Sequence, residues 1–111
     1  MGVIMNKKYI IRKNEEIQKI INNSLKLVNK YYIVYYSKND FDHNRYCISV
    51  SKKIGKAHIR NLYKRRIKDI LMKNNVNNSN DYVIILRNSI LDINYNDMSR
   101  ELIKLLKGDQ N

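Results

Sequence analysis

The sequence lacks several features that define whole classes of protein. Its 111 residues include no proline, no tryptophan and a single cysteine, Cys47. One cysteine excludes an intramolecular disulfide, and with two histidines, His43 and His58, it provides no set of ligands at zinc spacing. No long uninterrupted apolar run is present, which excludes a membrane-spanning helix. The sequence therefore predicts one small soluble domain without a structural metal site.

The amino terminus does not match a targeting signal. It begins with Met-Gly, but Asn6 stands where a myristoylation motif has serine or threonine. The apolar stretch between Met1 and Met5 is too short for a secretory signal. We expect a cytoplasmic protein with a single domain over residues 1–111, in which residues 1–6 are disordered or extended and residues 108–111 form a tail.

Acidic residues are scarce relative to basic ones. The chain has 10 Asp and Glu against 22 Lys and Arg, which gives a formal net charge of +12 at pH 7. A compact protein that keeps such an excess against self-repulsion usually has a polyanionic partner, most often a nucleic acid. The hydrophobic fraction of 43% is enough for one core. The composition therefore predicts a small nucleic-acid-binding domain.

Apolar periodicity predicts three helices and a small sheet. The spacing of apolar residues is helical at residues 14–23, 57–73 and 92–107, and Asn14 is expected to cap the first helix. Runs rich in β-branched and aromatic residues predict strands at residues 30–38, 45–51 and 82–86. A polar turn between the first two suggests that they pair as a hairpin. Helices packed on a small sheet form an α+β two-layer domain.

The cations gather on one flank of the middle helix. At about 100° per residue, five polar side chains fall within an arc of about 140°, away from the apolar stripe: Arg60, Asn61, Lys64, Arg65 and Lys68. Three lysines around Gly55 precede this helix, where free backbone N–H groups can also bind phosphate. A solvated charged face is the alternative reading. Such a face normally mixes both signs, however, and Asp69 is the only acidic residue of this helix. The candidate RNA-binding residues are Lys52, Lys53, Lys56, Arg60, Asn61, Lys64, Arg65 and Lys68.

Residues 45–65 resemble the signature of the bacterial ribonuclease P protein subunit. A strand ending in Ser-Val-Ser-Lys-Lys-Ile-Gly is followed by a helix carrying Arg-Asn-x-x-Lys-Arg. Weaker similarity extends to both sides and covers nearly the whole chain. The resemblance implies three helices packed on a small mixed four-stranded sheet, in the order α-β-β-β-α-β-α. It also implies a left-handed β-α-β crossover, which the general preference for right-handed crossovers would not predict.

The same resemblance implies a function and partners. The protein would bind the catalytic RNA of ribonuclease P and the 5′ leader of precursor tRNA, while the RNA and its Mg²⁺ ions cut the leader off. It would be a subunit of an endoribonuclease with no catalytic residue, metal site or cofactor of its own, and with no membrane and no obligate protein partner.

The resemblance further implies a cleft that holds the leader. Ile17 and Ile21 stand where the family commonly has phenylalanines that line this cleft, and Tyr35 matches its cleft aromatic. Tyr35 is then the main stacking candidate, although a strand tyrosine is otherwise often part of a core. The chain departs from the family at Leu62, where a cation is expected, and at Cys47, which stands where the family often has glycine.

Other function classes fit the sequence less well. A ribosomal or other structural RNA-binding protein has the same composition, and only the motif spacing separates it from a ribonuclease P protein. A protein nuclease could use His43 and His58 as an acid and base, but no third orienting group or carboxylate cluster accompanies them. Cys47 has no histidine nearby, so it reads as a small buried residue rather than a nucleophile. A membrane-surface protein would need an apolar helix face that the core already uses.

Overall fold

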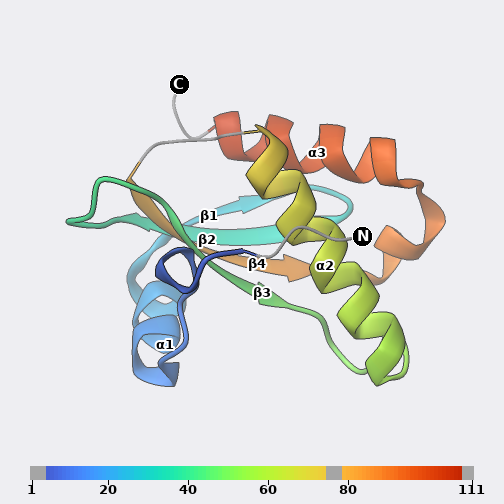
Figure 1. Ribbon diagram of the computed structural model, residues 1–111, viewed down its shortest axis with the longest axis horizontal. Coiled ribbons are helices and arrows are strands. Elements are labelled where there is room, and N and C mark those ends of the chain that lie inside the picture. The colour runs from blue at the N-terminus through green and yellow to red at the C-terminus, as the bar shows by residue number, and fades with distance from the viewer. Residues whose placement is uncertain (1–4, 75–78, 109–111) are drawn as a thin grey trace.

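The computed structural model describes residues 5–74 and 79–108, and its element order is the predicted one (Figure 1). The helices are α1 (Asn14–Asn23), α2 (Ala57–Asn74) and α3 (Tyr95–Gly108). The strands are β1 (Leu25–Val28), β2 (Tyr32–Lys38), β3 (Arg45–Ser49) and β4 (Asn80–Leu86). Two short 3-10 turns, η1 (Lys7–Tyr9) and η2 (Asn88–Asp92), precede α1 and α3.

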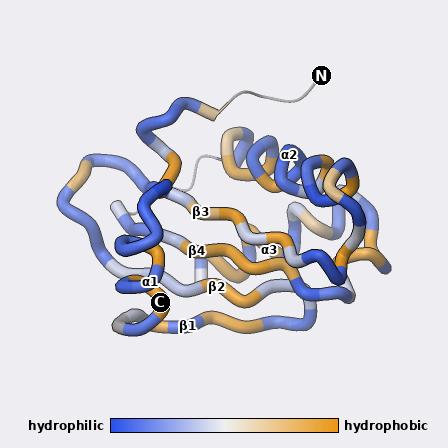
Figure 2. The backbone as a smooth tube through the Cα atoms, turned by 90° about the horizontal axis from the view of Figure 1, so that it is seen from below, coloured by the Kyte–Doolittle hydropathy of each residue, from blue (hydrophilic) through white to orange (hydrophobic). Residues whose placement is uncertain are grey.

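The four strands form one mixed sheet in the order β1-β2-β4-β3. β1 and β4 each pair with β2 antiparallel, and β3 pairs with β4 parallel. The predicted hairpin between residues 30–38 and 45–51 is therefore wrong, because β4 lies between the two strands. Six of the seven residues of β4 are buried, which suits a central strand covered on both faces. β3 and β4 run in one direction, as their arrowheads in Figure 1 show, and α2 joins them by a left-handed crossover, as the resemblance implies. Figure 2 shows the four strands side by side in the order of the sheet, with α2 beyond β3.

The helices cover the sheet unequally. Side chains of α2 and α3 pack on one face and bury Tyr32, Tyr82 and Ile84 completely in the main core. α1 lies on the opposite side of the sheet from α3 (Figure 1) and covers only part of that second face. The predicted apolar stripe of α2 is confirmed, since Tyr63, Ile67 and two neighbours one turn further are buried. The second face is therefore the one left partly open.

Helix starts and the first strand differ from the sequence prediction. Asn14 is the first helical residue of α1 rather than its cap. The N-cap residue is Lys13, whose side chain makes no capping hydrogen bond. α3 begins at Tyr95 rather than at Asp92, because η2 comes first and Asn94 Oδ1 accepts a hydrogen bond from the Asp97 N–H at 2.8 Å. β1 is not among the predicted strands. It has only four residues and no buried face, so it lacks the alternation of buried and exposed positions by which a strand is predicted.

The ends of the described chain are packed. Met5 is 6% exposed and belongs to the main core, and Asn6 is extended and accepts a hydrogen bond from the Lys8 N–H. The rest of the predicted amino-terminal segment (residues 1–4), residues 75–78 between α2 and β4, and residues 109–111 of the predicted tail lie outside the described residues. Among the helices that the structure describes, none is long and apolar enough to cross a membrane.

Candidate RNA-binding surface

The three predicted cleft residues lie in one cluster on the partly open face of the sheet. Tyr35 of β2 and Cys47 of β3 are both in register with Val83 of β4, so their side chains share this face. α1 packs Ile17 and Ile21 against the same group, and all of these side chains except Val83 stay half-buried. We call this set, Ile17, Ile21, Tyr35, Cys47 and Val83, the α1 cluster. Apolar residues of one helix and three strands, far apart in the sequence, thus form one surface.

The ring of Tyr35 is held next to a cation. Lys26 of β1 is paired with Tyr35, and its Nζ lies 5.8 Å from the ring centroid. This cation–π contact keeps a positive charge at the edge of the apolar surface. Along the strands the same face continues with Ile33 and Ile85, which are half-buried, and with the exposed Ser49. The surface therefore extends beyond the part that α1 covers.

A cavity connects the α1 cluster with the basic flank of α2. It has a volume of about 180 Å³ and lies between β3, the amino-terminal segment and α2. Cys47 of β3 and Ile11 of the amino-terminal segment line it, and Lys64 and Lys68 line it on the helix side. Cations predicted from the helix periodicity therefore stand directly beside the apolar surface predicted from the resemblance.

The basic flank of α2 has no acidic partners in the described part of the chain. Asn61 and Arg65 are exposed, and Arg60, Lys64 and Lys68 are half-buried, yet none of the four cations has a carboxylate within 4.0 Å there. Asp69, the acid of this helix, pairs instead with Lys73 at 3.1 Å. The Nε of Arg60 is buried and has no hydrogen-bond partner among the described residues. These donors are left available for an anion.

The lysine-rich turn before α2 depends on its glycine. Lys52, Lys53 and Lys56 are exposed, and Ile54 between them is buried in the main core. A Cβ atom at Gly55 would lie 2.9 Å from Cγ2 and 3.0 Å from Cβ of Ile59. A side chain at this position would therefore collide with the first turn of α2. Glycine lets the turn pack closely while the lysines point to solvent.

The structure does not assemble a protein nuclease from the histidines. His43 Nδ1 lies 2.9 Å from Asp42 Oδ1 and its Nε2 donates to the Lys8 carbonyl at 3.1 Å, whereas His58 is exposed on α2. Burial raises the pKa of the Cys47 thiol, and the nearby charge of Lys64 only partly opposes this. Cys47 is therefore a packed thiol rather than an activated nucleophile. Within residues 5–74 and 79–108, no three His, Cys, Asp or Glu side chains are placed to hold a metal ion.

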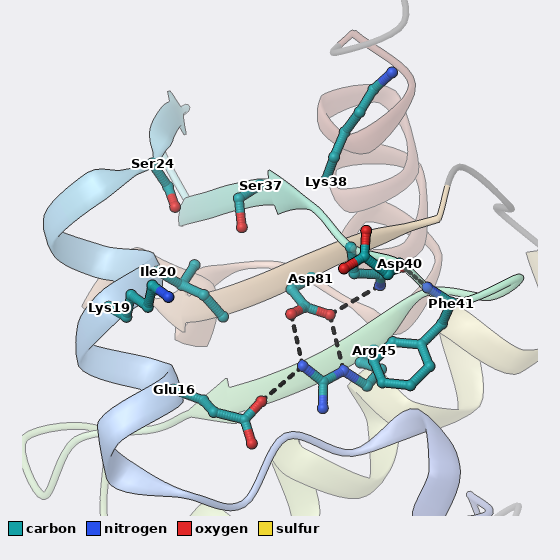
Figure 3. A pocket seen from close by; sticks show the side chains of 11 residues that line it. Glu16, Lys19, Ile20, Ser24, Ser37, Lys38, Asp40, Phe41, Arg45 and Asp81 are labelled. Atoms are coloured by element: carbon teal, nitrogen blue, oxygen red, sulfur yellow. Dashed lines mark hydrogen bonds and ion pairs between the residues drawn. The ribbon is translucent and has the colours of Figure 1, made fainter.

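Sequence reasoning missed an ion network beside α1. Arg45 of β3 bonds Asp81 of β4 and Glu16 of α1 (Figure 3). Arg45 and Asp81 are partners in the parallel register, so the network depends on the pairing of β3 with β4. The predicted hairpin excluded this contact, because it placed β2 rather than β4 beside β3. Without the strand order, the sequence offered no signal that could have found it.

Comparisons with known proteins agree with one another. A family model described as ribonuclease P matches residues 5–108. The ribonuclease P protein component of Mycoplasma mycoides is 44% identical over 107 residues, covering 93% of this chain and 97% of that protein. The corresponding protein of Streptococcus agalactiae is 33% identical over 104 residues, covering 93% and 95%.

Solved structures show the same similarity. A mutant of the RNase P protein of Staphylococcus aureus superposes with a TM-score of 0.87 at 32% identity, covering 94% of this chain and 90% of that one. The RNase P protein of Thermotoga maritima gives a TM-score of 0.81 at 29% identity, covering 87% and 94%. The chain therefore belongs to the ribonuclease P protein family, the protein component of the RNA-catalysed endoribonuclease that processes the 5′ end of tRNA.

Proposed function

We propose that this protein uses two adjacent surfaces for two RNA ligands. The basic flank of α2 and the preceding lysines bind the phosphate backbone of the ribonuclease P RNA. The α1 cluster binds the single-stranded 5′ leader of precursor tRNA. The observation that carries this proposal is the adjacency of the two surfaces across the cavity lined by Cys47, Lys64 and Lys68. The residues proposed for the RNA surface are Lys52, Lys53, Lys56, Arg60, Asn61, Lys64, Arg65 and Lys68.

The charge distribution supports the contact with the RNA subunit. A cation without a carboxylate partner can exchange its counterions for RNA phosphates at no cost in broken ion pairs. Arg60 adds a buried Nε–H without a partner in the described chain, at the base of this flank. Arginine is well suited to phosphate oxygens, because its forked N–H groups form charge-assisted hydrogen bonds with them. Phosphate contacts of this kind hold the protein in register on the RNA without reading sequence.

The α1 cluster supports the contact with the leader. Tyr35 is half-buried, so part of its surface is accessible, and the Lys26 Nζ lies over the ring, 5.8 Å from its centroid. A base stacked on an aromatic ring gains roughly 1–3 kcal/mol whatever its identity. Ile17 and Ile21 can pack against a sugar or a base edge but offer no aromatic face. The leader would thus be bound without a strict sequence requirement, as a subunit that serves many precursors needs.

The remaining parts of the proposal concern ions, partners and location. The catalytic Mg²⁺ ions belong to the RNA subunit, which carries most of the negative charge. The holoenzyme needs the RNA and its precursor tRNA substrate, no further obligate protein subunit, and works in the cytoplasm without a membrane.

The Arg65→Ala substitution tests the RNA surface. Each neutralised phosphate releases condensed counterions, so the log-log slope of affinity against salt changes by about 0.7–0.9 per contact. Arg65→Ala should therefore make this slope shallower by about that amount, measured by titrating the RNA subunit at several salt concentrations. Lys104→Ala is the matched control, because Lys104 is exposed on α3 and has no ion pair in the described chain. An unchanged slope with unchanged affinity for Arg65→Ala would mean that the residue faces solvent in the complex.

A further inference from the structure

The network around Arg45 joins three elements in one set of short contacts. Arg45 Nη2 lies 2.7 Å from Glu16 Oε2 and 2.7 Å from Asp81 Oδ2, and Arg45 Nε lies 2.9 Å from Asp81 Oδ1. Asn39, after β2, donates to Asp81 Oδ1 at 2.9 Å. The Arg45 and Asp81 side chains are 16% and 10% exposed, whereas Glu16 is 38% exposed. Arg45 is thus fixed to the sheet and reaches outward to α1.

α1 has few other attachments. Ile20 is the one buried side chain among the residues of this helix whose exposure is described, and the helix packs through Ile17, Ile20 and Ile21. Apolar packing of this kind is not directional, so by itself it sets the angle of a helix less sharply than a hydrogen bond does. Among the α1 residues whose side chains are described, Asn14 to Asn22, the contact of Glu16 with Arg45 is the one side-chain hydrogen bond or ion pair to another element. It is also directional, as charge-assisted hydrogen bonds are.

One flank of α1, beside the buried Ile20, borders open space. A cavity of about 390 Å³ lies there, bordered by Glu16 and Lys19 of α1 and by the segment from Ser37 to Phe41 (Figure 3). The Arg45–Asp81 pair forms part of its wall. On this flank, packing therefore holds α1 less tightly than a filled interior would. The contact between Glu16 and Arg45 spans the gap at this point.

We propose that Glu16 and Arg45 are positioning residues that set the preference of the holoenzyme for precursor tRNA over mature tRNA. Glu16 immediately precedes Ile17 on α1, so the ion pair fixes the angle at which Ile17 and Ile21 meet Tyr35. A helix that rocks would present this apolar surface in the correct shape for only part of the time, and leader affinity falls by that fraction. This inference rests on the proposed leader contact of the α1 cluster.

The test compares Glu16→Gln with Glu15→Gln in the holoenzyme reconstituted with ribonuclease P RNA. Both variants lose one negative charge in the first turn of α1, but Glu15 is exposed and has no ion pair in the described chain. Ion pairs with an exposed member are screened by solvent and contribute modestly, so Glu16→Gln should weaken precursor binding about two- to fivefold and leave mature tRNA binding unchanged. Glu15→Gln should leave the ratio of the two affinities as it is.

A Tyr35→Ala variant, measured in parallel, separates the two proposals. If Tyr35→Ala lowers precursor affinity selectively and Glu16→Gln does not, the positioning role is wrong and the leader surface stands. Equal losses for precursor and mature tRNA in Glu16→Gln would likewise overturn the positioning role. If neither variant changes the ratio, the leader contact itself is wrong, and the positioning role is overturned with it.

Discussion

Replacing Arg45 with methionine should lower the free energy of unfolding by about 3 kcal/mol. The substitution leaves the Asp81 carboxylate, only 10% exposed, without its charged partner. Removing one member of a buried ion pair is strongly destabilising because the other charge stays desolvated. The value lies at the low end of the usual range because Asn39 still donates to Asp81. Urea denaturation followed by circular dichroism measures the change.

A second variant shows whether the uncompensated charge is the cause. The double variant Arg45→Met with Asp81→Leu removes both members of the pair, and buried pairs replaced by apolar residues often cost little. It should therefore recover most of the stability lost by Arg45→Met. A single Arg45→Met variant within about 0.5 kcal/mol of the parent protein, the range of ordinary surface substitutions, would show that the network does not stabilise the fold.

Replacing Tyr35 with alanine should weaken binding of precursor tRNA by at most roughly 1–3 kcal/mol and leave binding of mature tRNA almost unchanged. Only the precursor carries the single strand that would stack on this ring. Arg60→Ala or Lys64→Ala should instead weaken assembly with the RNA subunit whether or not substrate is present, because phosphate contacts hold the protein in place before substrate arrives. Paired affinity measurements on the reconstituted holoenzyme give both quantities.

Tyr35→Phe is the control for this effect. It keeps the aromatic face and removes only the hydroxyl, so its precursor affinity should stay close to that of the parent protein. Equal losses for precursor and mature tRNA on Tyr35→Ala would rule out a leader contact at this ring. A domain that melts on Tyr35→Ala would show that Tyr35 is a core residue, which its half-buried position argues against.

The local elements and the signature were predictable from the sequence, whereas the neighbours of each strand were not. Helical periodicity predicts α2 because the buried residues of this 18-residue helix, from Tyr63 to Leu71, recur on one side. The strand β1, with only four mostly exposed residues, has no such pattern. Strand alternation says which side chains share a face but not which strand lies alongside, so β2 and β3 were paired wrongly. The left-handed crossover followed from the resemblance alone.

The candidate site shows the same division. The cations on α2 follow from helix geometry, and the structure leaves them without acidic partners in the described chain. Ile17, Ile21 and Tyr35 came from family positions, and the fold brings them into one cluster. The Arg45–Asp81–Glu16 network joins residues up to 65 positions apart and depends on the register of β3 with β4, which no local pattern encodes.

Reconstitution with a ribonuclease P RNA tests the proposed function most directly. Cleavage of a precursor tRNA is measured at near-physiological Mg²⁺ with the RNA alone and with the RNA plus this protein. A protein that neutralises RNA phosphates and holds the leader should replace part of the Mg²⁺ requirement. We expect clear stimulation of 5′ leader removal and no cleavage by the protein alone. An RNA whose cleavage rate at this Mg²⁺ concentration does not change when the protein is added would contradict the proposed function.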